Sequence, residues 1–213
     1  MRDFDLHKSS LNKVKEMRCL NKLNLSQRMK YPDCPEKFMD SEVDLDDAVQ
    51  DLFQSVNAPE LYPVLVETGA LGTLLLLLNH ENKDIAADVI QLLASLTDTT
   101  DNEEYVKPFQ TLVSSLLELN VVELLVLHLQ QRTEASDEDA AVIFNILTAL
   151  DNMIDVMPDV AQNISQNKQV QNLTLRAPGN NSPRQTHLLL QAPASSSIRH
   201  QTCFQQAPAH LHC

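Results

Sequence analysis

The stretch TGALGTLLLLLNHENKD, residues 68–84, contains five consecutive leucines, Leu74 to Leu78. Polar residues border this apolar run on both sides, so it is far shorter than the roughly 20 apolar residues that cross a membrane as a helix. On an α-helix, five consecutive residues point in every direction, because successive residues are about 100° apart around the axis. A helix that is apolar on all sides has to be covered on all sides. The run therefore predicts a short inner helix that other parts of the same chain surround.

The leucine run belongs to a pattern that occurs twice in the chain. Residues 65–78 align with residues 116–129 at a constant offset of 51, and beyond the connecting loop the offset becomes 54. Each copy reads as the end of one helix, a tight break, a short apolar helix, a polar loop and a longer amphipathic helix. A helical unit that recurs after about 50 residues indicates an α-solenoid. The leucine run is then the middle helix of such a unit, covered by helices of its own unit and of the neighbouring unit.

Apolar spacing and capping residues place the other helices. An amphipathic helix is predicted at about 42–56 with Ser41 as its N-cap, and Pro59 suits the first position of a second, short helix that Gly69 ends. Pro63, inside that short helix, is expected to bend it. The remaining predicted helices lie at about 84–97 with Asp84 as cap, at about 108–119, and at about 137–154 with Asp137 as cap.

Charge divides the sequence into three segments. Residues 1–30 carry eight basic and three acidic side chains, residues 31–163 carry four basic and 26 acidic ones, and residues 164–213 carry four basic and none acidic. We interpret them as a basic, weakly helical N-terminal segment, a helical repeat domain, and a tail rich in Gln, Ser, Pro and His whose composition predicts disorder. An acidic domain does not suit direct contact with nucleic acid phosphates, and it attracts basic segments of other proteins instead. A plain solubilising surface is the alternative.

No motif points to catalysis, a metal or a cofactor. Three glycines cannot supply a phosphate-binding loop and no nucleophile motif stands out, so the chain is predicted not to be an enzyme. The acidic cluster in residues 41–51 lacks the glycine and glutamate of a calcium loop, which favours a solvated helix face. His80 and His128 are each predicted to be structural or exposed, and the sequence suggests no partner for either. In the tail, histidines and cysteines at a spacing that matches no common zinc finger predict no metal site; they are His200, Cys203, His210, His212 and Cys213.

The repeat unit resembles an armadillo repeat. The unit at residues 66–98 has the helix-ending turn, short helix, polar loop and long helix of that repeat. Over about residues 27–161, the chain resembles the N-terminal domain of the beta-catenin-like protein 1 family, which is a family of spliceosome-associated armadillo-type proteins. The stretches that carry this resemblance are YPDCPEKFMDSEVDLDDAVQDL (31–52), PELYPVLVE (59–67), DVIQLLASLTD (88–98) and LNVVELLVLHLQ (119–130).

The resemblance refines the expected fold. We expect an all-α, armadillo/HEAT-like α-solenoid of about two repeats, with an N-terminal helical cap and a disordered C-terminal tail. Members of the family continue with further helical repeats and begin with a longer region that carries a nuclear import signal. The chain is therefore expected to be a truncated form of the N-terminal domain, and its open solenoid end is expected to favour self-association.

The resemblance also implies a function. It implies a protein-interaction scaffold in pre-mRNA splicing, located in the nucleus, whose partners are splicing-complex proteins with basic segments. No cofactor, direct nucleic acid contact or membrane contact is expected. Two alternatives remain: an adaptor that binds basic localisation-type segments outside the spliceosome, and a truncated product without independent function. Because the basic residues of 1–30 are dispersed, retention in the cytoplasm is the alternative localisation.

The family pattern suggests where a partner binds. The longest helix of each armadillo repeat lines a concave groove, and here these helices are the ones at about 84–97 and 137–154. The tryptophan–asparagine ladder of importin-type grooves is absent from the aligned positions, so importin-like recognition is not expected. Ordinary solvent-facing positions are the alternative to a groove. The candidate groove residues are Asp88, Gln91, Ser95, Asn145 and Asn152.

Overall fold

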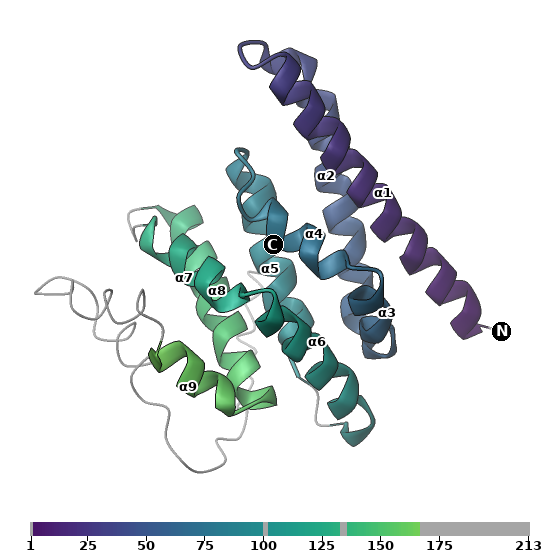
Figure 1. Cartoon of the computed structure of the whole chain (residues 1–213), viewed down its shortest axis with the longest axis vertical. Coiled ribbons are helices and arrows are strands. Elements are labelled where there is room, and N and C mark those ends of the chain that lie inside the picture. The colour runs from purple at the N-terminus through teal and green to yellow at the C-terminus, as the bar shows by residue number, and fades with distance from the viewer. Residues whose placement is uncertain (1, 100–101, 133–135, 167–213) are drawn as a thin grey trace, which may run out of the picture. The chain divides into compact units, whose positions relative to one another are not determined.

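Every regular element in the residues that the computed structural model describes, 2–99, 102–132 and 136–166, is a helix (Figure 1). All of these residues lie in the first of the two compact units of the chain, Met1–Asn181. The predicted all-α fold class is therefore confirmed.

Both predicted repeat units are present, each built from three helices. The first unit consists of α3 (Tyr62–Glu67), α4 (Ala70–Leu77) and α5 (Lys83–Thr97), and the second of α6 (Val106–Glu118), α7 (Val121–Gln130) and α8 (Asp137–Val156). The chain bends sharply between the first two helices of each unit, by 82° before α4 and by 67° before α7. The predicted bounds of α5, α6 and α8 hold to within two residues at each end, whereas the helix predicted at 42–56 begins three residues earlier and ends four residues earlier.

Each sharp bend is made by one residue in the left-handed backbone region. Gly69 has φ +69° and Asn120 has φ +58°, and the two positions are related by the repeat offset of 51. Glycine adopts this region without steric cost, and asparagine is one of the few other residues that tolerates it. A Cβ atom at Gly69 would also lie 3.3 Å from the guanidinium of Arg18. The bend before α4 thus favours glycine through its backbone conformation, and a larger residue would also require the Arg18 side chain to shift.

The two units stack through their long helices. Helix α5 packs extensively against α8 on one side and against α2 (Met39–Leu52) on the other (Figure 1). Helices α3 and α6 also pack together, where the rings of Tyr62 and Phe109 meet edge to face with centroids 5.2 Å apart. Helices α2, α5 and α8 therefore form one layer. The shorter helices of the two units form a second layer beside it.

The leucine run is covered less completely than its sequence predicts. Four of its five leucines are buried, but Leu76 is 69% exposed. Helix α4 packs against α1, α3 and α5, and these neighbours leave one side of it open to solvent. The expectation that α4 is covered on all sides is therefore wrong at Leu76.

The predicted N-caps of the long helices are displaced. Asn82 caps α5 by accepting a hydrogen bond from the Asp84 amide at 3.0 Å, and Ser136 caps α8 by accepting one from the Asp139 amide at 3.1 Å. Asp84 and Asp137 instead lie in the first turns, where a carboxylate interacts favourably with the helix dipole. Because Asn82 and Ser136 are related by the offset of 54, the capping position is part of the repeat.

The predictions for the helix start at Ser41 and for Pro63 are also corrected. Helix α2 begins at Met39, so Ser41 lies inside it and is buried, with its hydroxyl donating to the Phe38 carbonyl at 2.8 Å. Pro63 is the second residue of α3, where a helix leaves the backbone N–H without an internal partner. This proline therefore begins a helix rather than bending one. Short 3₁₀ helices fill the connections at Pro35–Lys37 (η1), Phe53–Asn57 (η2), Pro59–Leu61 (η3) and Glu103–Tyr105 (η4).

The weakly patterned N-terminal segment forms one continuous helix. Helix α1 (Arg2–Lys30) packs along α2, with Val14 and Met17 fully buried, and it also contacts α3 and α4. Polar contacts also hold this helix to the fold. Arg18, for example, donates a hydrogen bond to the Thr68 carbonyl at the turn before α4. Helix α1 thus forms a helical cap on the first repeat unit.

At the C-terminal end of the described residues, the last helix extends beyond residue 164, where the tail was predicted to begin. Helix α9 (Asp159–Gln166) packs against α8 and buries Val160 and Ile164. Residues 164–166 are therefore helical, contrary to the predicted disorder from residue 164. The rest of the predicted tail, with its histidine and cysteine cluster, lies outside the described residues.

Candidate protein-interaction surface

The residues predicted to line a groove lie on the neighbouring helices α5 and α8. Asp88, Gln91 and Ser95 belong to α5, and Asn145 and Asn152 belong to α8. Gln91 is exposed, and the other four are half-buried. All five therefore belong to the layer that α2, α5 and α8 form.

Two of these side chains form hydrogen bonds within the fold. The Asn152 amide nitrogen donates to the Ala94 carbonyl at 3.1 Å and lies 3.4 Å from Thr97 Oγ1, so it ties α8 to α5. The Ser95 hydroxyl donates to the Gln91 carbonyl one turn earlier, at 3.0 Å. Part of the predicted groove is thus a seam between packed helices.

Asp88 faces a carboxyl group from another helix. Asp46, on α2, forms a side-chain hydrogen bond with it, and Asp46 Oδ1 is buried without a hydrogen-bond partner in the described part of the chain. Burial, followed by the hydrogen bond and the charge of Asp88 and by the charges of Asp47 and Asp84, raises the pKa of Asp46 from 3.8 to about 6. Sequence reasoning missed this pair because its members are far apart along the chain. The pair concentrates negative charge between α2 and α5.

This pair predicts a pH-dependent stability. Because the pKa of Asp46 is higher in the folded state, the folded chain binds its proton more tightly between pH 3.8 and about 6, and stability falls as pH rises through that range. We expect Asp46→Asn, which keeps a hydrogen-bonding group without the charge, to raise the free energy of unfolding by about 1 kcal/mol at about pH 7.5 and to have almost no effect at about pH 4, allowing for solvent screening. Urea denaturation at several pH values measures this.

Asp44→Asn is the matched control for this prediction. Asp44 lies on the same helix but is exposed and is not among the groups that shift the pKa of Asp46. It should change stability little at either pH. If Asp46→Asn destabilises the chain at about pH 7.5, or if its effect does not depend on pH, the repulsion between the two carboxyl groups is refuted.

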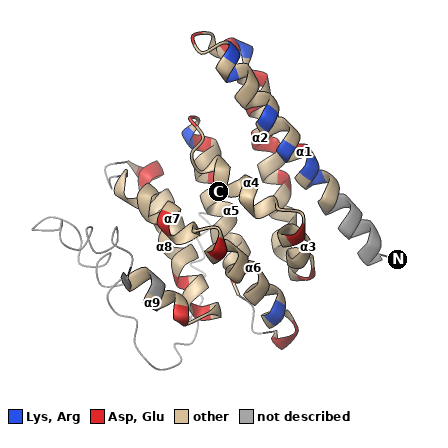
Figure 2. Cartoon of the chain, in the orientation of Figure 1, with Lys and Arg blue, Asp and Glu red and all other residues tan. Residues whose placement is uncertain are grey.

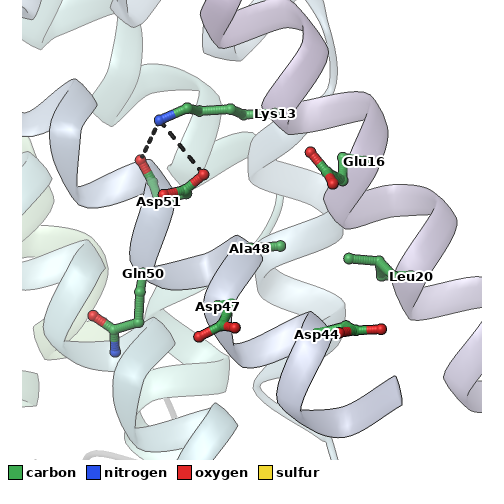
Figure 3. A pocket seen from close by; sticks show the side chains of 8 residues that line it. All are labelled: Lys13, Glu16, Leu20, Asp44, Asp47, Ala48, Gln50 and Asp51. Atoms are coloured by element: carbon green, nitrogen blue, oxygen red, sulfur yellow. Dashed lines mark hydrogen bonds and ion pairs between the residues drawn. The ribbon is translucent and has the colours of Figure 1, made fainter. Parts of the chain in front are cut away.

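A groove of about 550 Å³ lies between α1 and α2 (Figure 3). Leu20 and Ala48 contribute apolar surface to it. The Lys13 ammonium lies 3.6 Å from the Asp51 carboxylate and 2.8 Å from Gln54 Oε1 at one end. The acidic residues that line the groove are Glu16, Asp44, Asp47 and Asp51. The groove therefore combines apolar contact surface with an excess of negative charge.

Charge is distributed unevenly over the described helices. The ribbon of Figure 2 marks acidic residues along α2, α5, α7 and α8, whereas basic residues gather on α1. On α8, burial and the charge of the neighbouring Asp155 raise the pKa of Asp151. We call the groove residues on α2, together with Asp46 and Asp88, the acidic surface. It is a surface to which a positively charged ligand would be drawn.

A buried polar network holds the α1–α2 hairpin to the loop between α4 and α5. The Arg28 guanidinium forms ion pairs with Glu42 and Glu81 and lies 4.6 Å from the ring centroid of Phe38. The Asn82 amide nitrogen also donates to Glu42, at 3.1 Å. The network therefore links three segments that are distant in the sequence.

Both histidines singled out in the sequence have structural roles, as one of the two predicted alternatives has it, but the expectation that neither has a partner is wrong. His80 Nε2 lies 3.0 Å from Asn24 Oδ1 in the network, and burial followed by the charge of Arg28 lowers the pKa of His80. His128 is buried in α7 and hydrogen-bonds to the backbone of Leu78 in the first repeat unit. Both imidazoles therefore connect helices of the fold.

Some classes of site are missing from the described residues. Within residues 2–99, 102–132 and 136–166, no group of three or more histidine, cysteine, aspartate or glutamate side chains could hold a metal ion. In the same ranges no single helix is both long and apolar enough to span a membrane, while two bent helix pairs meet the length and composition criteria. The acidic surface is thus the most distinctive chemical feature of the described chain.

Comparison with known proteins places this fold in a family. The sequence model of the family described as "Catenin-beta-like, Arm-motif containing nuclear" matches residues 8–187, which is most of the chain. The chain belongs to the catenin-beta-like family. The stretch at residues 32–42 that carried the sequence resemblance supplies Phe38, Ser41 and Glu42 to the buried polar region, so this segment has a structural role in the catenin-beta-like fold.

Named members of the catenin-beta-like family match about two thirds of this chain. Beta-catenin-like protein 1 of Homo sapiens is 39% identical over 137 residues, which are 64% of this chain and 24% of the human protein. The protein of the same name from Rattus norvegicus is 38% identical over 143 residues, 67% of this chain and 25% of the relative. The Beta-catenin-like protein 1 homolog of Schizosaccharomyces pombe is 31% identical over 146 residues, 68% of this chain and 25% of the relative. The matched region spans about a quarter of the length of these relatives.

Proposed function

We propose that this chain is a non-enzymatic protein-interaction scaffold that acts in the nucleus, in pre-mRNA splicing, by binding basic segments of splicing-complex proteins. Membership of an Arm-motif family supports protein binding, because stacked helical repeats present extended surfaces to partners. The resemblance to spliceosome-associated proteins supports the assignment to splicing.

The observation that carries the proposal is the charge of the groove between α1 and α2. Four carboxylates and one ammonium line it, and that ammonium is already paired with Asp51. On the same helix, burial together with the hydrogen bond and the charge of Asp88 raises the pKa of Asp46 to about 6, so these two carboxyl groups repel each other when both are ionised. A lysine or arginine side chain of a partner would relieve this repulsion, so a basic segment is the ligand that the acidic surface favours.

A labelled peptide rich in lysine, arginine and leucine tests the binding directly. We expect the double variant Asp44→Asn/Asp47→Asn to weaken its binding about fivefold, because two charges of the groove are lost. Raising the salt concentration from about 50 to 300 mM should weaken binding to the unchanged chain as well. Fluorescence anisotropy measures both effects.

The control carries the same charge change elsewhere. Glu67→Gln/Glu123→Gln alters two exposed carboxylates, on α3 and α7, and should leave the affinity almost unchanged. An equal loss of affinity in both double variants would show that only the net charge matters, and binding of a glutamate-rich peptide with the same affinity would exclude the proposed ligand.

The assignment to splicing needs a cellular experiment. The tagged chain, its Asp44→Asn/Asp47→Asn variant and its Glu67→Gln/Glu123→Gln control are purified from nuclear extract. Recovery of splicing proteins with the chain and the control, and their loss with the groove variant, is the expected result. Recovery of nuclear import proteins instead would favour an adaptor outside the spliceosome, and recovery of chaperones alone would favour a product without independent function.

A further inference from the structure

Helix α1 presents a surface of the opposite charge. Residues 11–30 carry six basic side chains and one acidic side chain. Three of the six point toward the rest of the fold: Lys13 binds Asp51 and Gln54, Arg18 binds the Thr68 carbonyl, and Arg28 binds Glu42 and Glu81. The other three, Lys15, Lys22 and Lys30, form no ion pair within the described residues; the Lys30 ammonium lies 5.1 Å from the ring centroid of Tyr31. The three inner basic side chains of α1 thus have hydrogen-bond or ion-pair partners within the fold, whereas the three outer ones form no ion pair within the described residues.

Two large apolar side chains lie beside the outer lysines without a covering helix. Leu25 is 58% exposed and Met29 is 77% exposed. Together with Arg18 and Lys22 they recur at i, i+4, i+7 and i+11, so all four share one side of α1. At Arg18 this side contacts the turn before α4. This side of α1 therefore packs against the first repeat unit at Arg18 and continues, uncovered, to Leu25 and Met29.

The uncovered part of the stripe forms a shallow hollow of about 400 Å³. Its lining residues all come from α1: Lys22, Leu25, Ser26, Met29 and Lys30. Single exposed apolar side chains are ordinary, but here two long, adaptable ones are adjacent and an ammonium group lies at each end. Lys22 and Lys30 are about 12 Å apart along the axis, at 1.5 Å per residue. We call this hollow the lysine-flanked surface.

We propose that the lysine-flanked surface of α1 docks an acidic amphipathic helix of a partner protein. Leu25 and Met29 supply the apolar contact, and Lys22 and Lys30 pair with carboxylates two turns apart on the partner helix. A nucleic acid strand is a poorer occupant, because the hollow has no aromatic side chain on which bases could stack. The surface is separate from the acidic surface, so one chain would bring an acidic and a basic partner together.

A synthetic helical peptide of about five turns, with leucines on one face and glutamates two turns apart beside them, is the probe. We expect Leu25→Ser/Met29→Ser to weaken its binding about tenfold and Lys22→Gln/Lys30→Gln to weaken it about threefold, as measured by fluorescence anisotropy. All four side chains are exposed, so the variants should keep the helix content and thermal stability of the parent chain, which circular dichroism checks.

Matched controls separate this surface from general effects. Leu76→Ser changes an exposed leucine on α4, and Lys37→Gln/Lys83→Gln removes two exposed lysines elsewhere; both should bind the probe like the unchanged chain. A peptide with the same composition but scrambled order should bind at least about tenfold more weakly.

Four outcomes would overturn the proposal. The first is probe binding that neither α1 double variant changes. The second is that the chain binds phosphatidylserine vesicles but not the peptide, and that the α1 double variants abolish this vesicle binding. The third is that a single-stranded oligonucleotide binds in place of the peptide and that the same variants abolish its binding. The fourth is self-association of the chain that Leu25→Ser/Met29→Ser removes, which would make a second copy the occupant. Loss of basic-peptide binding in the acidic-surface variants leaves this proposal standing, because those variants change no residue of the lysine-flanked surface.

Discussion

Replacing Arg28 with alanine is expected to lower the free energy of unfolding by about 3 kcal/mol, since it removes the cation from a buried ion pair. The side chains of Arg28 and Glu42 are only 14% and 15% exposed, so the variant leaves the Glu42 carboxylate buried without its cation. It also removes the stacking of the guanidinium over Phe38. The loss should be visible as a shift in the midpoint of urea denaturation.

Two further variants show whether the buried charge is the cause. Glu81, the other partner of Arg28, is 82% exposed, and Glu81→Gln should cost less than about 0.5 kcal/mol, as exposed ion pairs do. Adding Glu42→Gln to Arg28→Ala should recover part of the lost stability, because the amide is no longer charged and still accepts a hydrogen bond from Asn82. If Arg28→Ala costs less than about 1 kcal/mol, or the second substitution only adds to the loss, the network does not depend on this pair.

The repeat architecture could be predicted because its signals are local and occur twice. The alignment at offsets of 51 and 54 located all six helices of the two units, and Gly69 identified the first sharp bend by its residue type. The second break was predicted as well, but not the residue that makes it, Asn120, because asparagine is a weaker signal of left-handed backbone than glycine. Carrying Gly69 forward by the offset of 51 would have found it. The capping pair Asn82 and Ser136 would have followed from the offset of 54 in the same way.

The candidate site was only partly predictable. The position of Asp88 on the long helix of the first unit follows from the repeat, but its contact with Asp46 depends on how α2 packs against α5, which no local pattern encodes. The same is true of His80, whose partner Asn24 lies 56 positions away on α1. The acidic composition of residues 41–51 was evident, whereas the groove that α1 completes beside them was not. The acidic character of the surface could thus be predicted from the sequence, whereas the contacts between residues distant in the sequence could not.

The leucine run shows the limit of periodicity at the level of single residues. A helix with both apolar and polar positions reveals its exposed side by the spacing of the polar ones. Five consecutive leucines contain no such spacing, so the sequence cannot indicate which of them faces solvent. The fold distinguishes them, because it buries Leu74, Leu75, Leu77 and Leu78 and leaves Leu76 exposed.

Leu74→Ala and Leu76→Ala therefore form a matched pair with very different expected effects. Leu74 is 1% exposed, and its truncation should cost about 3 kcal/mol through lost burial and the cavity that remains. Leu76 lies two residues further along the same helix and is largely exposed, so the same substitution should change stability by less than about 0.5 kcal/mol. Alanine has the higher helix propensity, which makes even a small gain reasonable for Leu76→Ala.

Urea denaturation of the two variants beside the unchanged chain measures the difference, and an unchanged m-value would show that both variants unfold from the same fold. Equal losses of about 3 kcal/mol would mean that α4 is covered on all sides, as the apolar run alone suggests, and would contradict the packing of α1, α3 and α5 around it. Equal and negligible effects would mean that the leucine run does not form the middle helix of a packed repeat. That result would contradict the solenoid fold on which both proposed surfaces depend.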